Sequence, residues 1–301
     1  MVFSVERLGR SLKINNHQTS EALSASLKNF RSQLSNFLNQ LVLKSEIPES
    51  EYLSLPWFHH CYDTLHMSNK AFAKLVVDID YPMSKWGNAA TEEYLNYSFN
   101  LLKLLNSISS SLSHLSQAKL EISHALSLVP NSPSYAIHRL KKIQLKGPRN
   151  NFEVEILARS EEMVCSKKES VILQALLVMK STGLWVLGLV LLGLCSDHIK
   201  PSVALLDDSL PEGVESRVCK LIIEKKGVME EVKELNNAAR RLAEITPSER
   251  WNDAAKDMEK RLEVLENSIL GIENQTNYLF SEFLAARDKL LDYLGHTKHE
   301  P

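Results

Sequence analysis

The sequence has few of the residues that divide a chain into short elements. Glycine and proline each occur 10 times in 301 residues, which is too sparse for the tight turns of an all-β or α/β protein. The four cysteines (Cys61, Cys165, Cys195 and Cys219) stand far apart and form no Cys-x-x-Cys pair. This spacing argues against a disulfide framework or a zinc ribbon and indicates buried thiols in a reducing compartment.

The chain also lacks a strong charge of either sign. The formal net charge is −2, so nothing attracts the whole molecule to nucleic acid, and no nucleic-acid partner is expected. The first sixteen residues have no apolar core of signal-peptide length and contain Glu6. We therefore expect a cytoplasmic protein that is not secreted. Plastid targeting is doubtful, because transit peptides are rich in Ser and Arg and poor in acids.

The chain is instead rich in apolar residues at alternating spacings of three and four, which is typical of a helix with one buried seam. The longest seam runs for about 65 Å before Pro130, at a rise of ~1.5 Å per residue, and only Lys119 and Ser98 interrupt it. Its members are Tyr94, Ser98, Leu101, Leu105, Ile108, Leu112, Leu115, Lys119, Ile122, Leu126 and Val129.

Four other segments carry the same pattern. The first seam is predicted at Leu23, Leu27, Phe30, Leu34, Phe37 and Leu41, and a second helix is predicted from Trp57 to Ile79. A third covers residues 214–242, with Val228 in its seam. The last begins at a capping box formed by Thr246 and Glu249 and ends at Gly295. Short helices are predicted around 133–146 and 152–164.

These seams predict an all-α fold, namely an elongated antiparallel helical bundle with coiled-coil-like seams and a central apolar helix. We expect a flexible arm over residues 1–18 and one helical domain over 19–295. That domain includes an apolar helix at about 168–196 and a loop at about 197–211. Residues 296–301 form a tail.

The stretch from Val171 to Cys195 is the only segment that is apolar on every side. A membrane span over 176–196 is feasible, because about twenty residues cross the ~30 Å hydrocarbon core and Lys180 could reach the interface. The alternative is a core helix, since seams on both flanks need each other for burial. Both interpretations stay open. The candidate membrane or central-helix residues are Leu176, Lys180, Leu184, Trp185, Leu187, Leu191 and Leu194.

Residues 138–149 form a basic segment that could contact acidic lipid or an acidic partner. Its candidate contact residues are Arg139, Lys141, Lys142, Lys146 and Arg149. A solvated helix face explains the same pattern.

No pattern predicts catalysis or a cofactor. The cluster His59, His60, Cys61, Asp63 and His66 is the only metal-like group, but a zinc site needs three or four converging ligands and nothing supplies the remaining one. No Gly-rich phosphate-binding loop is present. We therefore expect no enzyme activity, no metal and no cofactor.

The region from Trp57 to Val129 resembles the plant BYPASS family of helical proteins. The similarity lies in WFHHCYDTLHMSNKAFAKLVVDIDYPMSKW and YLNYSFNLLKLLNSISSSLSHLSQAKLEISHALSLV, with Trp57 and Trp86 as landmarks. A weaker similarity continues through residues 173–194 and the two C-terminal helices.

This resemblance implies a regulator of plant development that restrains a root-derived mobile signal which arrests shoot growth. Related families are similar to exocyst-binding proteins, which implies helical partners in secretion. The leading hypothesis is a non-enzymatic protein that binds helical partners. The alternatives are an adaptor anchored in the endoplasmic reticulum or another endomembrane, and an unrecognised enzyme of signal metabolism.

Overall fold

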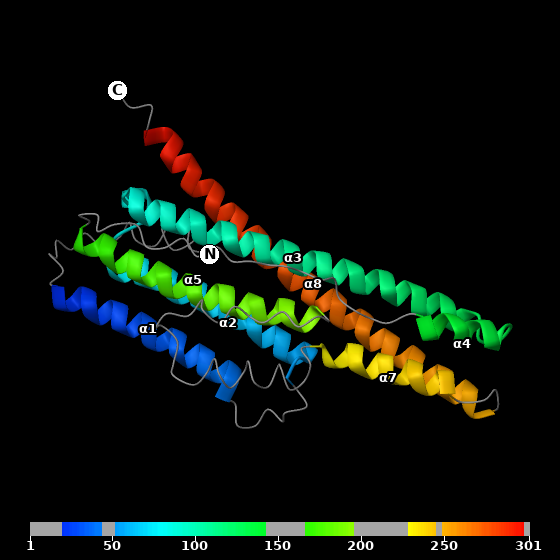
Figure 1. The fold of residues 1–301 in the computed structure, drawn as a ribbon. Helices are drawn as coiled ribbons and strands as arrows, with labels where there is room; N and C mark the ends of the chain where they lie inside the picture. Colours follow the sequence, from blue (N-terminus) through cyan, green and yellow to red (C-terminus); the bar gives the residue numbers. More distant parts are fainter. Residues whose placement is uncertain (1–19, 44–51, 143–165, 196–227, 245–248, 298–301) are drawn as a thin grey trace.

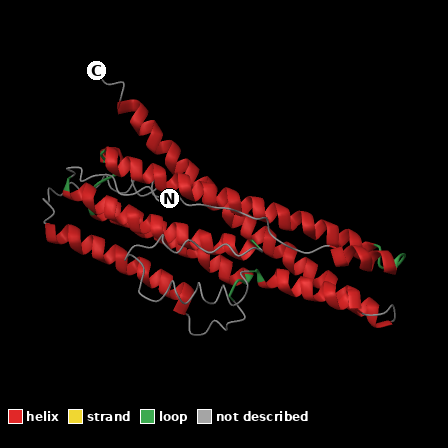
Figure 2. Ribbon diagram, in the orientation of Figure 1, coloured by secondary structure: helices red, strands yellow, loops and turns green. Residues whose placement is uncertain are grey.

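The computed structural model describes residues 20–43, 52–142, 166–195, 228–244 and 249–297. Across these residues every regular element is helical, which confirms the all-α prediction, and Figure 2 shows no strand among them. The predicted arm over 1–18, the short helix at 152–164 and the loop at 197–211 lie outside the described residues. The elements are α1 (Ser20–Leu43), α2 (Leu55–Asp78), the 3₁₀ helix η3 (Met83–Lys85), α3 (Asn88–Ser127), α4 (Pro133–Lys142), α5 (Lys167–Leu194), α7 (Glu230–Glu244) and α8 (Glu249–Thr297).

The helices form an elongated antiparallel bundle (Figure 1). In that view α1, α3, α5 and α7 run in one direction, and α2, α4 and α8 run in the other. The two longest helices, α3 and α8, extend over most of the molecule. The shorter α5 and α7 lie end to end beneath them, joined by a hydrogen bond of 2.8 Å from the Met229 N–H to the Gly193 carbonyl oxygen.

Helix α3 is the long seam helix that the spacing predicts. Its 40 residues reach about 60 Å, and every predicted seam residue in it is buried except Lys119. The Lys119 ammonium pairs with the Glu266 carboxylate of α8. The seam is therefore interrupted where a charged contact between the two long helices replaces an apolar one.

The predicted seam of α1 is wrong at one position. Leu38 is buried and Phe37 is only half-buried. Phe37 and Leu38 are one residue apart, so they lie about 100° apart on the helix, on opposite sides of the line through Leu34 and Leu41. The helix buries the side that carries Leu38, and Phe37 packs against the edge of the core.

Helix α5 is the central helix of the bundle. It begins after Ser166, whose hydroxyl oxygen accepts a hydrogen bond of 3.1 Å from the Glu169 N–H, and it ends two residues before the predicted boundary at 196. Helices α1, α2 and α3 all pack against it. The prediction of a central apolar helix is confirmed.

The other C-terminal elements correct two predictions. Residues 214–227 of the helix predicted over 214–242 lie outside the described residues; in the part that is described, Val228 and Met229 are not helical and α7 begins at Glu230. At the far end α8 continues through Gly295 to Thr297. A glycine inside the last turn costs only about 1 kcal/mol relative to alanine and does not by itself end a helix. Thr246 lies outside the described residues.

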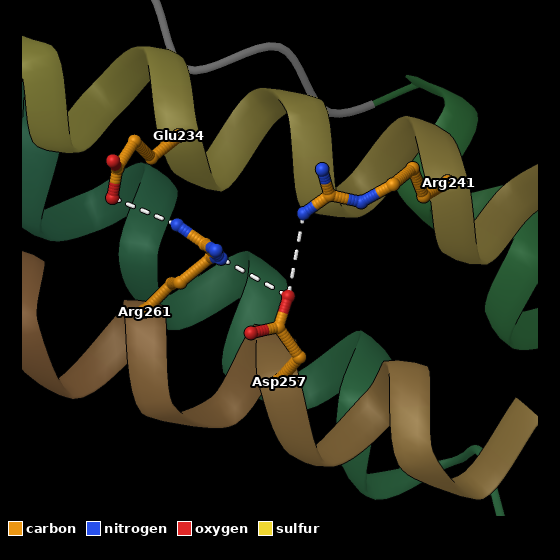
Figure 3. Close-up of polar contacts among 4 residues, drawn as sticks. All are labelled: Glu234, Arg241, Asp257 and Arg261. Atoms are coloured by element: carbon orange, nitrogen blue, oxygen red, sulfur yellow. Dashed lines mark hydrogen bonds and ion pairs between the residues drawn. The ribbon is translucent and has the colours of Figure 1, made fainter.

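Helices α7 and α8 are joined by charged side chains on their outer sides (Figure 3). Arg261 donates to Glu234 at 2.7 Å and to Asp257 at 3.0 Å, and Arg241 donates to the same Asp257 oxygen at 3.3 Å. The hydrogen bond that Arg261 donates to Asp257, together with the charges of Arg261 and Arg241, holds the pKa of Asp257 below its usual range. The inner side of α7 is apolar and buries Val232, Leu235, Ala238 and Leu242.

Candidate interaction surfaces

The candidate central-helix residues lie inside the bundle. Each of the predicted apolar members is buried, and none lies on the surface of the molecule. They are Leu176, Leu184, Trp185, Leu187, Leu191 and Leu194. Helix α5 is the one described helix that is long and apolar enough to cross a membrane, and 83% of its apolar window is buried among its neighbours. Insertion into a bilayer would therefore require α5 to leave α1, α2 and α3.

Lys180 is the one charged residue in the middle of α5, and it is buried. Its ammonium lies 3.0 Å from a carboxylate oxygen of Glu93 on α3. A buried ammonium needs such a partner, because leaving water without one costs several kcal/mol. The pair gives the sequence a reason for a lysine within an apolar helix that does not involve a membrane interface.

The basic segment is only partly described. Arg139 donates toward the Nδ1 atom of His124 at 2.7 Å, and its guanidinium lies 5.8 Å from the centre of the Tyr135 ring. Lys141 is exposed. The side chain of Lys142, and Lys146 and Arg149, lie outside the described residues. Arg139 is thus occupied by contacts within the bundle, so a patch of five cations stays a prediction.

The histidine-rich cluster of α2 does not converge. Cys61 points into the core, where burial raises the pKa of its thiol, while Asp63 is exposed. The Nδ1 atom of His66 lies 3.7 Å from a Glu282 oxygen of α8. Within the described ranges no three His, Cys, Asp or Glu residues are placed to hold a metal ion.

Sequence reasoning missed a junction at which the N-termini of α2 and α7 meet the C-terminus of α5. The Glu230 N–H donates to the Leu53 carbonyl oxygen at 3.1 Å, and the Leu55 N–H donates to a Glu231 carboxylate oxygen at 2.9 Å. Ser54 holds the N-cap position of α2 but forms no capping bond. Glu231 therefore caps α2 from a helix that is remote in sequence.

The junction contains strained and incompletely paired groups. Leu53 is fully buried and has a backbone φ of 65°, a conformation that costs a non-glycine residue of the order of 1–3 kcal/mol. The second carboxylate oxygen of Glu231 is buried and has no hydrogen-bond partner among the described residues. Burial raises the pKa of Glu231, and the bond from Leu55 only partly offsets that effect.

The two long helices carry large apolar side chains that are exposed. On α8 these are Val264, Leu270, Tyr278, Leu284 and Leu291, and on α3 they are Phe99 and Leu120. At about 100° per residue, Leu270, Leu284 and Leu291 share one side of α8, whereas Val264 and Tyr278 lie on another. Exposed apolar side chains that share one side mark interaction sites more often than single ones do. We call Leu270, Leu284 and Leu291 the second apolar face of α8.

Comparison with known proteins identifies relatives of the chain. A family model described as Protein BPS1 matches residues 136–292, which is more than half of the chain. The match covers the C-terminal part, whereas the strongest resemblance noted in the sequence lies between Trp57 and Val129. No solved structure matches the chain.

Curated relatives come from two plants. Protein BPS1, chloroplastic, of Arabidopsis thaliana is 31% identical over 125 residues, which is 41% of this chain and 35% of the relative. UPF0496 protein 4 of Oryza sativa subsp. indica is 35% identical over 88 residues, which is 29% of this chain and 19% of the relative. The chain therefore matches about a third or less of the length of these relatives.

Proposed function

Because the chain belongs to the Protein BPS1 family, we propose that it is a non-enzymatic regulator of plant development that acts by binding helical partner proteins. The observation that carries this proposal is the second apolar face of α8, on which Leu270, Leu284 and Leu291 are exposed. A rod of packed helices with an uncovered apolar face suits helix-to-helix binding. By family resemblance, the proposed role is to restrain a root-derived mobile signal, with exocyst-type proteins as candidate partners.

Proximity labelling in plant tissue tests this proposal, because it reports partners and compartment together. The chain is fused to a labelling enzyme and compared with an unrelated helical protein of similar size fused to the same enzyme. We expect a reproducible set of neighbours that is absent from the control and that includes proteins with long amphipathic helices. A neighbour set identical to that of the control would contradict the proposal.

A second candidate function is a membrane-associated adaptor, and the observation that favours it is the length and apolarity of α5. We assign α5 to the bundle, because its apolar residues are buried and Lys180 pairs with Glu93. Carbonate extraction of membranes from plant tissue separates the two functions. Release of the chain into the soluble fraction is expected, and retention in the pellet would support an anchor at the endoplasmic reticulum or another endomembrane.

A further inference from the structure

An exposed aromatic side chain lies where α3 meets the C-terminal part of α8. Phe99 of α3 is 52% exposed, although it is large and apolar. The Arg287 guanidinium of α8 lies 5.9 Å from the centre of its ring. Leu284 and Leu291, 42% and 44% exposed, are three residues before and four residues after Arg287, so they are its neighbours on the helix surface. We call Phe99, Lys103, Leu284, Arg287 and Leu291 the α3–α8 face.

The two cations of the α3–α8 face surround Phe99. The Lys103 ammonium lies 5.6 Å from the ring centre, on the same helix. Arg287 is held in place, because its Nη1 donates to the Leu95 carbonyl oxygen at 2.8 Å. Neither cation forms an ion pair with any carboxylate of the described residues. The α3 side of the face therefore presents positive charge that nothing in the described chain neutralises.

The opposite border of the face is acidic. Asp288 and Asp292 are exposed and follow Leu284 by four and eight residues, which places them on the side of the leucines away from Arg287. The apolar line thus has a basic border toward α3 and an acidic border on its other side. An anionic lipid surface would be attracted by the first border and repelled by the second.

The leucines of this line are spaced for a helix. Leu270, Leu284 and Leu291 are separated by multiples of seven residues, with Asn277 at the remaining heptad position. One heptad line of 21 residues extends about 32 Å along α8. A coiled-coil seam uses two positions of each heptad, and this line fills one of them. Because the line runs along the axis of α8, a partner helix that lies alongside α8 can contact it over its length.

We propose that the α3–α8 face is the docking site for an amphipathic helix of a partner protein whose flank facing α3 is acidic. This inference rests on the proposed function and names its partner class. The partner's apolar residues pack on Leu284, Leu291 and Phe99. Its carboxylates pair with Lys103 and with the guanidinium N–H groups of Arg287 for which the described residues supply no acceptor. Both cations already lie beside the Phe99 ring, so a partner helix that packs on Phe99 also brings its carboxylates close to Lys103 and Arg287.

Binding of a designed helix to the purified full chain tests the proposal. The probe is a fluorescent peptide of about three heptads, with leucine at the a and d positions, glutamate on one flank and glutamine on the other. We expect the change in anisotropy to show saturable binding that weakens as salt increases. Lys103→Glu and Leu284→Ser should each weaken binding by about tenfold or more.

Matched substitutions elsewhere keep the test specific. Lys74→Glu on α2 changes another exposed lysine, and Leu120→Ser changes an exposed leucine farther along α3. Both should leave binding unchanged, and thermal unfolding of all four variants should match that of the original chain. Absence of binding, or binding unaffected by Lys103→Glu and Leu284→Ser, would overturn the proposal.

Two further measurements distinguish other occupants of the face. Sedimentation with vesicles of phosphatidylcholine and phosphatidylserine that depends on Lys103 and Leu284, without peptide binding, would assign the face to a membrane. A dimer in light scattering that Leu284→Ser dissociates would assign it to a second copy. Either result overturns the proposal.

Proximity labelling with the Lys103→Glu, Leu284→Ser double variant separates this inference from the proposed function. Loss of helical neighbours from the set obtained with the original chain supports the face. If the set is unchanged, the docking site is wrong but the proposed function stands. If the original chain has no specific protein neighbours, the proposed function itself fails.

Discussion

Helices α5 and α7 lie end to end, yet their sequences are opposite in character. α5 is surrounded by α1, α2 and α3 and has apolar residues on all sides, whereas α7 packs mainly on α8 and α4 and is charged on its outer side. The number of neighbours accounts for the difference, since a helix must be apolar wherever another helix excludes water from it. The apolar character of α5 thus matches its crowded position in the bundle.

The largest predicted difference between the two helices is the loss of stability when a buried leucine of each is replaced by alanine. Leu187→Ala in α5 should lower the free energy of unfolding by about 3–5 kcal/mol, because the fully buried side chain is enclosed by several helices that cannot collapse into the space. Leu235→Ala in α7 should cost about 2 kcal/mol, since a helix with fewer neighbours relaxes more easily. Urea unfolding of both variants measures the difference, and an equal or larger cost in α7 would contradict our account.

Two glycines of α5 sharpen the same comparison within one helix. A Cβ atom on Gly193 would lie 2.6 Å from the Phe58 ring and 3.1 Å from Leu53, while one on Gly188 would meet nothing within 4 Å. Gly193→Ala should therefore destabilise the chain by about 1–3 kcal/mol through overpacking. Gly188→Ala should stabilise it by about 0.4–1 kcal/mol, because alanine restricts the unfolded chain. Thermal unfolding tests both, and the same sign for the two variants would show that close packing at Gly193 is not the cause.

The sequence predicts these helices better than it predicts the contacts between them. The seam of α3 follows from spacing alone, because burial of one side of a helix is a local property of the chain. Whether α5 crosses a membrane could not be decided in that way, since a bilayer and a crowded bundle select the same apolar residues. The partner of Lys180 could not be read from the local sequence either, because Glu93 is 87 residues away.

The junction and the α3–α8 face could not be predicted for the same reason. Leu55 and Glu231 are 176 residues apart, and nothing in either local sequence indicates that one helix caps the other. Arg287 and Leu95 are 192 residues apart. A partial signal existed for the face, because Leu284 and Leu291 repeat at seven residues outside the main seam of α8. Spacing could show that second line but not the cations beside it.

At the junction where α5 and α7 meet, a buried carboxyl group should make the stability of the chain depend on pH. Burial raises the pKa of Glu231 above its value in the unfolded chain, so the folded chain binds this proton more tightly. Below the unfolded pKa of ~4.3 the carboxyl group is protonated in both states, and its charge costs nothing. As the pH rises from there through the folded pKa, the folded chain loses stability because it must bury a charged carboxylate. Glu231→Gln keeps an oxygen acceptor for the Leu55 N–H and removes that cost. The variant should be more stable than the original chain at pH 7, and the difference should shrink as the pH is lowered toward 4.

Glu231→Ala provides the control for this effect. It removes the acceptor as well as the charge, so loss of the cap should destabilise the chain by about 1 kcal/mol at pH 7. Melting temperatures of the three proteins between pH 4 and pH 7 separate the cap from the charge. A glutamine variant that is less stable than the original at pH 7, by as much as the alanine variant, would show that the charge itself is required.

The smallest effect is predicted for the outer side of α7, where Arg241, Arg261, Asp257 and Glu234 form a solvent-exposed network (Figure 3). Arg241→Ala should cost about 0.2–1 kcal/mol, and less at high salt, because exposed ion pairs are weak and screened. The hydrogen bond from Arg261 lowers the pKa of Asp257, so the stability that this carboxylate contributes is present above its unfolded pKa and is lost as the pH falls through the lower, folded value. The difference between Arg241→Ala and the original chain should therefore disappear in strong acid as well as in high salt. A cost that persists in both conditions would mean that Arg241 stabilises α7 through packing of its aliphatic stem, and that the outer side of α7 is closer in character to α5 than its charges indicate.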